Sequence, residues 1–511
     1  MSVIPFATRG GTAPMLAAAL LFTAPAAAQS PQEAAEKLAS FLDRFPDLGP
    51  GYAVVVVTPD EVLLRDVRGV RKAGEDVPLT TDTPLYIASQ TKAYVGLLAA
   101  RLDAEGILAL DDRITDHWPD VEFPGDVDPE MWSLRDLLAH NVPIECGYVT
   151  TMEAYVTELA SSDYPALLAT HAIEREEGFR YDNLGYNVWG AILETATGKS
   201  WRTWLDEKLF EPLALERTSS RTSDFALDEL SWSHIWQGPE LGWFPVRPKT
   251  DPMMQSAGGL VTSVDDMATF LQVQLKGGVL ADSGLTEAIV SEAQAEAAFL
   301  DPDEPNPYEL PCSAYALGWN VCDFEGHTLY IHGGGYTGAR TMMAFAPELG
   351  VGIAVFSNSD NMTGWLTSRT IVQYLQYLTE HPDADRMSDV RARVYPQRIQ
   401  RLLDGRIQDR RRAQDDERWG DWSWEPGESE LRSYVGSFES DDPYLTAEVT
   451  LEDGQLWITV GGTRAWLIPA VEDLFGSYTD PFSGPEPMQW TRDDAGAVTG
   501  FTWQDVAYGD V

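Results

Sequence analysis

The chain has 511 residues, of which 44% are hydrophobic and 23% charged; this is ordinary for a soluble globular protein and too long for one compact domain. Its 80 acidic residues outnumber 36 basic ones, so the formal net charge is -44. A field of that sign repels phosphate backbones, and we therefore expect no nucleic acid partner. The acidity fits either a saline habitat or a bias in genomic composition.

The first residues are typical of a secretory signal peptide. Arg9 precedes the apolar run Met15–Phe22, and Ala26 and Ala28 fit an Ala-x-Ala cleavage site. The run is shorter than the roughly 20 residues that a membrane-spanning helix needs, and an uncleaved anchor is the alternative interpretation. We expect a signal peptide over residues 1–28, a periplasmic or secreted mature protein, and no stable membrane insertion after cleavage.

In the mature region, the order of helical and strand-like segments predicts one antiparallel sheet built from both ends of a domain. Residues 34–45 have the pattern of an amphipathic helix, and turn residues join the β-branched run 52–57 to a second strand at 61–67, which predicts a hairpin. Helical periodicity runs from Ser89 to Leu102. Strand character returns in three later segments, 329–331, 341–345 and 351–356. We predict an α+β fold with helices flanking the sheet.

Past residue 380 the composition changes twice. Residues 385–418 mix basic and acidic side chains, and we interpret them as a solvated helix leading out of the first domain, in preference to a basic partner-binding patch. From Tyr434, short alternating strands are separated by hairpin signals such as Asp453-Gly454 and Gly461-Gly462. We expect a separate small all-β, barrel-like domain at the C-terminus.

The chain has three cysteines, Cys146, Cys312 and Cys322. Cys312 and Cys322 flank a strand-like stretch, and an exported compartment permits a disulfide between them. We favour separate buried thiols over that disulfide. The cysteine and histidine spacings match no ligand set for zinc, so we predict no metal site.

The first chemical motif is Ser89 followed by Lys92. Serine is a poor nucleophile without a base nearby, and residues i and i+3 share one face of a helix. At the start of the predicted helix, Ser89 also lies at the positive end of the helix dipole, which stabilises developing negative charge. A buried lysine beside it loses its proton more readily than in water. The alternative is a helix-capping serine next to a surface lysine.

Two later motifs supply further candidates. A tyrosine near a cationic lysine has a lowered pKa, so Tyr181 is a candidate general base. Asn183 offers an amide donor for a substrate carbonyl and a carbonyl for the lysine. In the run from His332 to Gly338, glycines permit close approach of a substrate, and the N–H groups of Gly335 and Ser89 are candidates for an oxyanion hole.

Together and in this order, the motifs resemble the serine β-lactamase and penicillin-binding protein superfamily, especially its class C β-lactamase, D-aminopeptidase and esterase members. Further segments that resemble the family are Gly106–Asp112, Leu134–His140, Glu194–Gly198 and Ala257–Leu260. The resemblance implies that Ser89 is acylated, Lys92 activates it and Tyr181 is the base. The substrate-binding residues that it implies are Asn183, His332, Gly333, Gly334 and Gly335. It also implies that no metal or organic cofactor is needed.

The same resemblance implies an antiparallel sheet with helices on its faces, an all-helical lobe, and a C-terminal lipocalin-like barrel. The domains expected are a signal peptide (1–28), a β-lactamase-like serine hydrolase domain (31–380), a charged helical linker (381–430) and an all-β lipocalin-like domain (431–511).

One departure bears on the substrate. β-Lactamases usually carry Lys-Thr-Gly where this chain has His332-Gly333-Gly334, and an imidazole and a glycine bind a carboxylate less well. We expect an exported hydrolase that forms an acyl-enzyme on Ser89 and cleaves D-amino-acid-containing peptides and amides, or small esters. The alternatives are a penicillin-recognising enzyme and a catalytically silent cell-wall peptide-binding protein. The sequence leaves open the oligomeric state, the role of the barrel and the effect of Asp182 on Tyr181.

Overall fold

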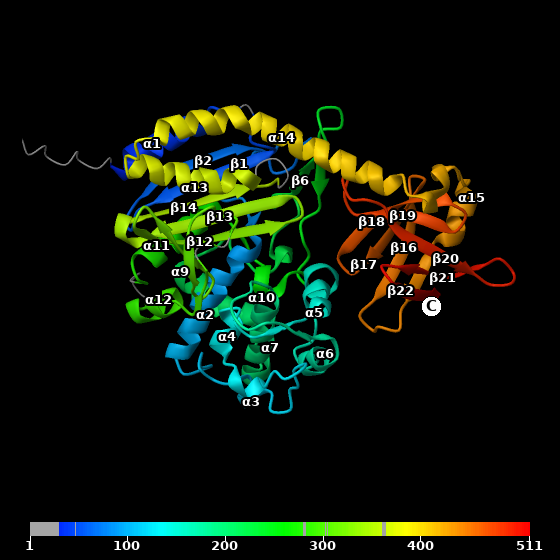
Figure 1. The fold of residues 1–511 in the computed structure, drawn as a ribbon, viewed down its shortest axis with the longest axis horizontal. Coiled ribbons are helices and arrows are strands. Elements are labelled where there is room, and N and C mark those ends of the chain that lie inside the picture. The colour runs from blue at the N-terminus through cyan, green and yellow to red at the C-terminus, as the bar shows by residue number, and fades with distance from the viewer. Residues whose placement is uncertain are drawn as a thin grey trace, which may run out of the picture.

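A computed structural model describes residues 30–45, 47–278, 283–301, 303, 305–359 and 364–510. The expected signal peptide lies outside these residues. The described chain has three parts, namely a large sheet covered by helices, a helical lobe below it and a C-terminal barrel beside them (Figure 1).

The large sheet confirms the prediction that both ends of the first domain build it. Its strand order is β2-β1-β14-β13-β12-β11-β10-β9, and all neighbours are antiparallel. The strands are β1 (Gly51–Val57), β2 (Val62–Gly69), β9 (Ala298–Phe299), β10 (Cys312–Tyr315), β11 (Asn320–Phe324), β12 (His327–Tyr336), β13 (Ala339–Ala346) and β14 (Val351–Ser357). Alternate residues of β1 enter two different cores, which explains its unbroken apolar sequence.

Helices cover both faces of this sheet. On one face α1 (Pro31–Leu42), α13 (Gly364–Leu378) and α14 (Ala384–Gln414) enclose a core with β1 and β14. On the other face α2 (Thr91–Ala104), α11 (Val264–Leu275) and α12 (Glu287–Gln294) enclose a second core. The layered α+β arrangement is therefore as predicted.

The lobe below the sheet is mainly helical (Figure 1). Its helices are α3 (Ile114–His117), α4 (Leu134–Leu138), α5 (Gly147–Thr151), α6 (Tyr164–His171), α7 (Leu184–Thr197), α8 (Trp201–Leu205), α9 (Glu211–Leu213) and α10 (Gln255–Gly258). Two short two-stranded pairs belong to this region: β3 (Leu85–Tyr86) with β8 (Val261–Thr262), and β4 (Ile144–Glu145) with β5 (Ile173–Glu174). A third pair, β6 (Ser233–Trp236) with β7 (Trp243–Val246), lies beside the turn between β12 and β13 and the end of β14.

The C-terminal part is a closed barrel of eight antiparallel strands, which confirms the all-β prediction. Its strands are β15 (Gly436–Glu439), β16 (Thr446–Glu452), β17 (Gln455–Val460), β18 (Thr463–Val471), β19 (Leu474–Tyr478), β20 (Glu486–Arg492), β21 (Val498–Trp503) and β22 (Val506–Asp510), and the short α15 (Glu428–Leu431) precedes them. Buried aromatic side chains such as Phe475, Trp490 and Phe501 fill the interior. The barrel core is thus packed with side chains.

The predicted solvated helix is α14, which runs from the covered face of the sheet toward the barrel (Figure 1). It is less solvated than expected, because Arg391, Tyr395 and Leu403 are buried against neighbouring elements. Pro396 lies inside the helix. The helix therefore packs along the first domain before it reaches the barrel.

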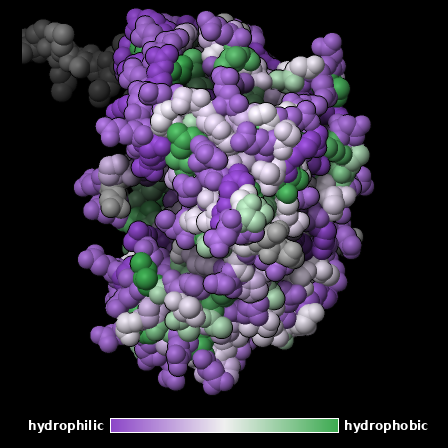
Figure 2. Space-filling view, turned by 90° about the vertical axis from the view of Figure 1, so that its right-hand side faces the viewer, coloured by the Kyte–Doolittle hydropathy of each residue, from purple (hydrophilic) through white to green (hydrophobic). Residues whose placement is uncertain are grey.

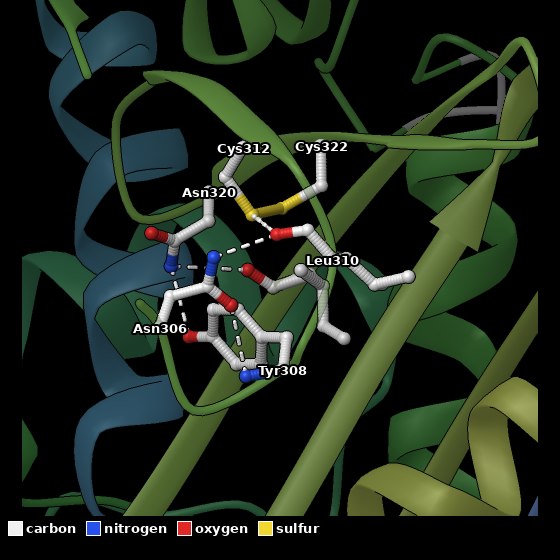
Figure 3. The surroundings of a disulfide bond; sticks show 7 residues. Asn306, Tyr308, Leu310, Cys312, Asn320 and Cys322 are labelled. Atoms are coloured by element: carbon white, nitrogen blue, oxygen red, sulfur yellow. Dashed lines mark hydrogen bonds between the residues drawn. A yellow bond between two sulfur atoms is a disulfide. The ribbon is translucent and has the colours of Figure 1, made fainter. Parts of the chain in front are cut away.

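Cys312 and Cys322 form a disulfide between the paired strands β10 and β11, so the expectation of separate thiols is wrong (Figure 3). Their Cα atoms are register partners, which brings the sulfur atoms within bonding distance. Cys146 is a buried free thiol.

The face of the molecule that carries the barrel is largely hydrophilic, with hydrophobic residues scattered over it (Figure 2). This agrees with the high content of acidic residues. Across the described residues, no helix combines the length and apolar character needed to cross a membrane.

Candidate active site

Ser89 lies in η1 (Ala88–Gln90), a 3-10 turn that leads directly into α2. The preceding residue, Ala88, has a φ of 47°, in the left-handed region that a residue with a Cβ rarely adopts. Thr91 stabilises this turn, because its Oγ1 donates to Ala88 O at 2.7 Å and accepts from Leu260 N–H at 3.1 Å. The strained turn presents the half-buried Ser89 at the end of the helix.

Lys92 is fully buried on the same helix face as Ser89, and its Nζ donates to Asn183 Oδ1 and to Ala257 O, both at 2.8 Å. Burial lowers the pKa of Lys92 to about 7, and the charge of Asp182 acts in the opposite direction. A neutral amine has two N–H bonds, and these two acceptors use both. Its lone pair is left for the proton of Ser89, one turn earlier.

Tyr181 and Asn183 precede α7 and lie beside the nucleophile. The Lys92 Nζ is 4.9 Å from the centroid of the Tyr181 ring, and a hydrogen bond joins Tyr181 to Ser89. The structure therefore brings Ser89, Lys92, Tyr181 and Asn183 together, although they come from two separate segments of the sequence.

The pKa of Tyr181 differs from the sequence expectation. Burial raises the pKa of its phenol, and the hydrogen bond with Ser89 only partly offsets this. Tyr181 is 42% exposed to the cavities around it, so water moderates the rise. This exposure does not reverse the rise in the pKa of Tyr181, because a neutral Lys92 supplies no positive charge near the phenol. Lys92 is thus the better base, and Tyr181 is a neutral phenol able to pass on a proton.

His332 is buried behind this group and is neutral. Its Nδ1 lies 2.8 Å from Gly333 O, and its Nε2 lies 3.2 Å from Tyr315 Oη. These partners assign the proton to Nδ1 and the lone pair to Nε2. Burial lowers the pKa of His332 to about 3, and the charge that Lys92 carries when it is protonated acts in the same direction. The third motif therefore carries no positive charge.

The glycines of the third motif, which begins at His332, lie where β12 no longer pairs with β11. β11 pairs with β12 as far as Ile331, and beyond that point β12 approaches the segment before Ser89. A Cβ on Gly334 would collide with Ile87 O, so only glycine fits there. Gly335 lines the cavities next to Ser89, in a position suited to the predicted oxyanion hole.

Two cavities meet at the nucleophile. The first, here the Asn183 cavity, has a volume of about 520 Å³ and includes Tyr155, Tyr336 and Asp480 in its wall. The second, here the Trp365 cavity, has a volume of about 830 Å³ and includes His332 in its wall. The residues that line both are Ser89, Tyr181, Gly335 and Arg340. Tyr336 lines the Asn183 cavity, whereas Trp236 packs against Trp243.

The barrel shapes the Asn183 cavity through the turn of residues Met152–Val156, a π-helical turn labelled η3. Val156 O accepts a hydrogen bond from Gly462 N–H at 3.1 Å, and Tyr155 O accepts one from Thr463 Oγ1 at 2.9 Å. Ala154 and Tyr155 of the same turn line the cavity. The barrel hairpin between β17 and β18 thus holds one wall of the site.

Several contributors were not predicted from the sequence. Ala257 O binds Lys92 through a backbone atom, which no side-chain pattern reveals. Tyr315 contacts His332 from β10. Arg340 had a visible signal, since it is a lone cation in the apolar strand β13. Arg406 and Asp480 come from the helix and barrel that follow the first domain, where no motif pointed to the site.

The comparisons with known proteins agree with this geometry. A family model described as Beta-lactamase matches residues 38–373, about two thirds of the chain. The chain belongs to the beta-lactamase family. Penicillin-binding protein 4 of Amycolatopsis lactamdurans is 27% identical over 326 residues, which cover 62% of this chain and 83% of that protein. This places the protein among serine hydrolases that share the fold.

Two solved structures in the same fold extend the comparison. The octameric penicillin-binding protein homologue from Pyrococcus abyssi is 20% identical with a TM-score of 0.57, over 93% of this chain and 99% of that one. D-amino acid amidase from Ochrobactrum anthropi, complexed with L-phenylalanine amide, is 20% identical with a TM-score of 0.55, over 68% and 99%. At these identities the likeness concerns the fold.

Proposed function

We propose that this serine hydrolase cleaves amide bonds of D-amino-acid-containing peptides and amides, with small esters as further substrates, through an acyl-enzyme on Ser89. Lys92 Nζ takes the Ser89 proton as Oγ attacks the carbonyl carbon, and the N–H groups of Ser89 and Gly335 receive the oxyanion. The C–N bond then breaks, and the leaving amine takes a proton that reaches it through Tyr181. Water attacks the ester, releases the acid and restores the Ser89 hydroxyl.

The observation that carries this proposal is the state of Lys92. A buried amine with a pKa of about 7 and both N–H bonds occupied is a base at neutral pH, one helical turn from a serine. A binding protein without catalysis has no need of a buried, deprotonated lysine. The arrangement therefore favours turnover over the silent alternative.

Three observations support the choice of substrate. His332 is neutral and Gly333 has no side chain, so the third motif lacks the cation that binds a β-lactam carboxylate. Asp480 places one carboxylate in the wall of the Asn183 cavity, beside Arg340 and Arg406, and this carboxylate is a partner for a substrate ammonium group. One similar structure is that of an enzyme named D-amino acid amidase.

We also propose that the protein works outside the cytoplasm, in the periplasm or after secretion. The disulfide between Cys312 and Cys322 supports this, because such bonds persist in oxidising compartments. The Ala-x-Ala pattern near residue 28 gives further support.

The test is intact-mass labelling of the protein with a fluorophosphonate, with Ser89→Ala as the control. We expect one adduct that is absent from Ser89→Ala. Turnover is then compared for the D- and L-alanine p-nitroanilides and for benzylpenicillin. Faster release from the D-anilide supports the proposal. A folded protein without an adduct would establish the binding-protein alternative, and rapid hydrolysis of the penicillin would replace the proposed substrate with a β-lactam.

A further inference from the structure

Tyr181 is carried by a loop, here the tyrosine loop (residues 175–181), that runs from the end of β5 toward the start of α7. Among the described residues, the backbone of 176–179 makes no hydrogen bond to another backbone group. Arg180 N–H donates to His140 O at 3.1 Å, just before the tyrosine. Contacts other than regular secondary structure therefore have to fix the position of the phenol.

The guanidinium of Arg175 supplies such contacts at four carbonyl groups. Its Nη1 donates to Glu176 O at 3.0 Å and to Gly178 O at 2.9 Å, both inside the tyrosine loop. Its Nη2 donates to His140 O at 2.9 Å and to Val142 O at 2.8 Å, in the segment that follows α4. All four Nη–H bonds are thus used, and together they join the loop to this segment.

Arg175 differs in its partners from the other arginine of the loop. Arg180 forms an ion pair with Glu145 at 3.2 Å, and its side chain is 62% exposed. Among the described residues no carboxylate forms an ion pair with Arg175, although the chain has 80 acidic residues. Burial lowers the pKa of Arg175, so its charge needs well-directed acceptors in place of water. A planar fork meets four carbonyls at once, which the single nitrogen of a lysine cannot do.

The segment at the other end of these bonds is fixed and contacts the phenol. His140 is buried, and its φ of 59° lies in the left-handed region. Its ring centroid is 4.7 Å from that of Tyr181 and 5.8 Å from that of Phe179, and its Nδ1 accepts from Asp182 N–H at 3.4 Å. His140, to which Arg175 joins the loop, is thus also the residue against which the Tyr181 ring lies.

We propose that Arg175 is a positioning residue for Tyr181, because its guanidinium joins the tyrosine loop to His140 and so holds the phenol beside Ser89. The inference rests on the proposed acyl transfer at Ser89, in which Tyr181 passes a proton to the leaving amine. Arg175 itself does not touch the reacting atoms. Its contribution is therefore large where the leaving group needs a proton, as an anilide does, and small where it leaves as a stable anion, as nitrophenolate does.

The test uses two substrates with one acyl group, D-alanine p-nitroanilide and the p-nitrophenyl ester of D-alanine. The ratio of their kcat/KM values, anilide over ester, isolates the proton given to the leaving group, once the ester rate is corrected for spontaneous hydrolysis. Both values are measured on the upper plateau of the pH profile, where Lys92 is neutral. Arg175→Gln is expected to lower this ratio by about 100-fold, the effect of a displaced proton donor. Arg180→Gln is the matched control from the same loop and is expected to keep the natural ratio.

A double variant shows whether Arg175 acts through the phenol. Tyr181→Phe alone removes the proton donor and lowers the ratio, and Arg175→Gln added to it is expected to lower the ratio no further. A purely structural role would instead reduce the anilide and ester values equally. Equal losses with both substrates, an unchanged ratio in Arg175→Gln, or a second fall of the same size in the double variant would each overturn the proposal.

Two further arms keep the outcomes separate. If Arg175→Gln does not fold, Arg175→Lys serves instead, since it keeps the charge but loses the fork; a partial fall in the ratio is expected, and a natural ratio would overturn the proposal. If the protein prefers L-alanine, the L-alanine pair gives the same ratio. A natural protein without a fluorophosphonate adduct on Ser89 contradicts both proposals, whereas an adduct with an unchanged ratio in the Arg175 variants contradicts this inference alone.

Discussion

At the scale of single residues, the chemistry depends on which group holds the proton. Burial lowers the pKa of Lys92 to about 7, so a large share of it is neutral near pH 7, and burial also keeps Tyr181 a neutral phenol. Burial disfavours the charged form of each group, which lowers the pKa of the amine and raises the pKa of the phenol. Lys92 is thus suited to accept a proton and Tyr181 to donate one.

This assignment predicts the pH dependence of kcat/KM. Protonated Lys92 is inactive, so kcat/KM rises with pH through an apparent pKa of about 7 and then levels. The charge of Asp182 raises the pKa of Lys92, so Asp182→Asn moves this limb to lower pH. A pH profile of p-nitroanilide hydrolysis measures both. A limb that does not move in Asp182→Asn, or activity that falls as pH rises through 7, would remove Lys92 from the role of base.

At the scale of elements, β12 packs so closely against the turn before α2 that no side chain fits between their backbones. Gly334 lies against Ile87 O, and Thr341 Oγ1 donates to the same oxygen at 3.2 Å. This contact sets the distance between the glycine strand and Ser89. The width of the oxyanion hole is therefore determined by backbone packing between two elements.

Gly334→Ala tests that packing. The added Cβ pushes β12 from Ile87, and we expect a loss of about 1–3 kcal/mol in the free energy of unfolding and a fall in kcat/KM of at least about 100-fold. Denaturant titration and steady-state kinetics measure the two. Gly147→Ala is the control, because a Cβ there meets nothing within 4 Å and φ lies outside the left-handed region. Equal effects of the two substitutions would show that the contact is unimportant.

The disulfide acts on a neighbouring element, the loop before β10. Tyr308 and Asn306 of this loop line the Trp365 cavity, and Asn306 Nδ2 donates to Leu310 O at 2.6 Å (Figure 3). Asn320 Nδ2 donates to Tyr308 Oη at 2.9 Å from the next strand. The crosslink between Cys312 and Cys322 thus anchors one end of a cavity wall.

Removal of this crosslink by Cys312→Ser with Cys322→Ser predicts a loss of about 2–3 kcal/mol in the free energy of unfolding, since the bond closes a loop with a sequence separation of 10. Thermal or urea unfolding measures it. Reduction of the natural protein by dithiothreitol is expected to give the same shift. A double variant with natural stability would show that the strand pairing alone holds this loop.

The fold was largely predictable from the sequence, and the site was predictable where side chains form local motifs. Ser89 and Lys92 are three residues apart where a 3-10 turn leads into α2, and hairpin signals reveal the barrel strands. Ala257 and Arg340 were not predicted. Ala257 accepts from Lys92 through its backbone oxygen, which leaves no pattern in the sequence. Arg340 lies beside Gly335 through the register of β12 and β13, which the sequence does not reveal. The pKa of Tyr181 was expected in the wrong direction, since sequence reveals a nearby lysine but neither its burial nor its charge.

At the scale of the whole molecule, the barrel and the first domain form one active site. The hairpin of Gly461 and Gly462 contacts the turn of Met152–Val156, and Tyr148 Oη donates to Asp442 Oδ2 at 2.6 Å across the same boundary. Since the barrel interior is filled by its own aromatic side chains, its contribution to the site comes from its loops.

Gly461→Ala is expected to loosen this contact. Gly461 has a φ of 55°, and a Cβ there would collide with Val156 O. Gly454, in another barrel hairpin with a φ of 80°, has open space around it. Both alanines strain the backbone by about 1–2 kcal/mol, but only Gly461→Ala should lower kcat/KM. If steady-state kinetics show the same effect for both, the barrel contact does not shape the site.

The contribution of α14 and the barrel also bears on how such enzymes diverge. The family match ends at residue 373, whereas Arg398, Leu402, Arg406 and Asp480 line the cavities around Ser89. Recombination that joined a foreign C-terminal quarter to this nucleophile would leave the acylation chemistry intact and replace the walls that select the substrate. New specificities are therefore accessible to this lineage by exchange of a segment, without any change in the residues that break the bond.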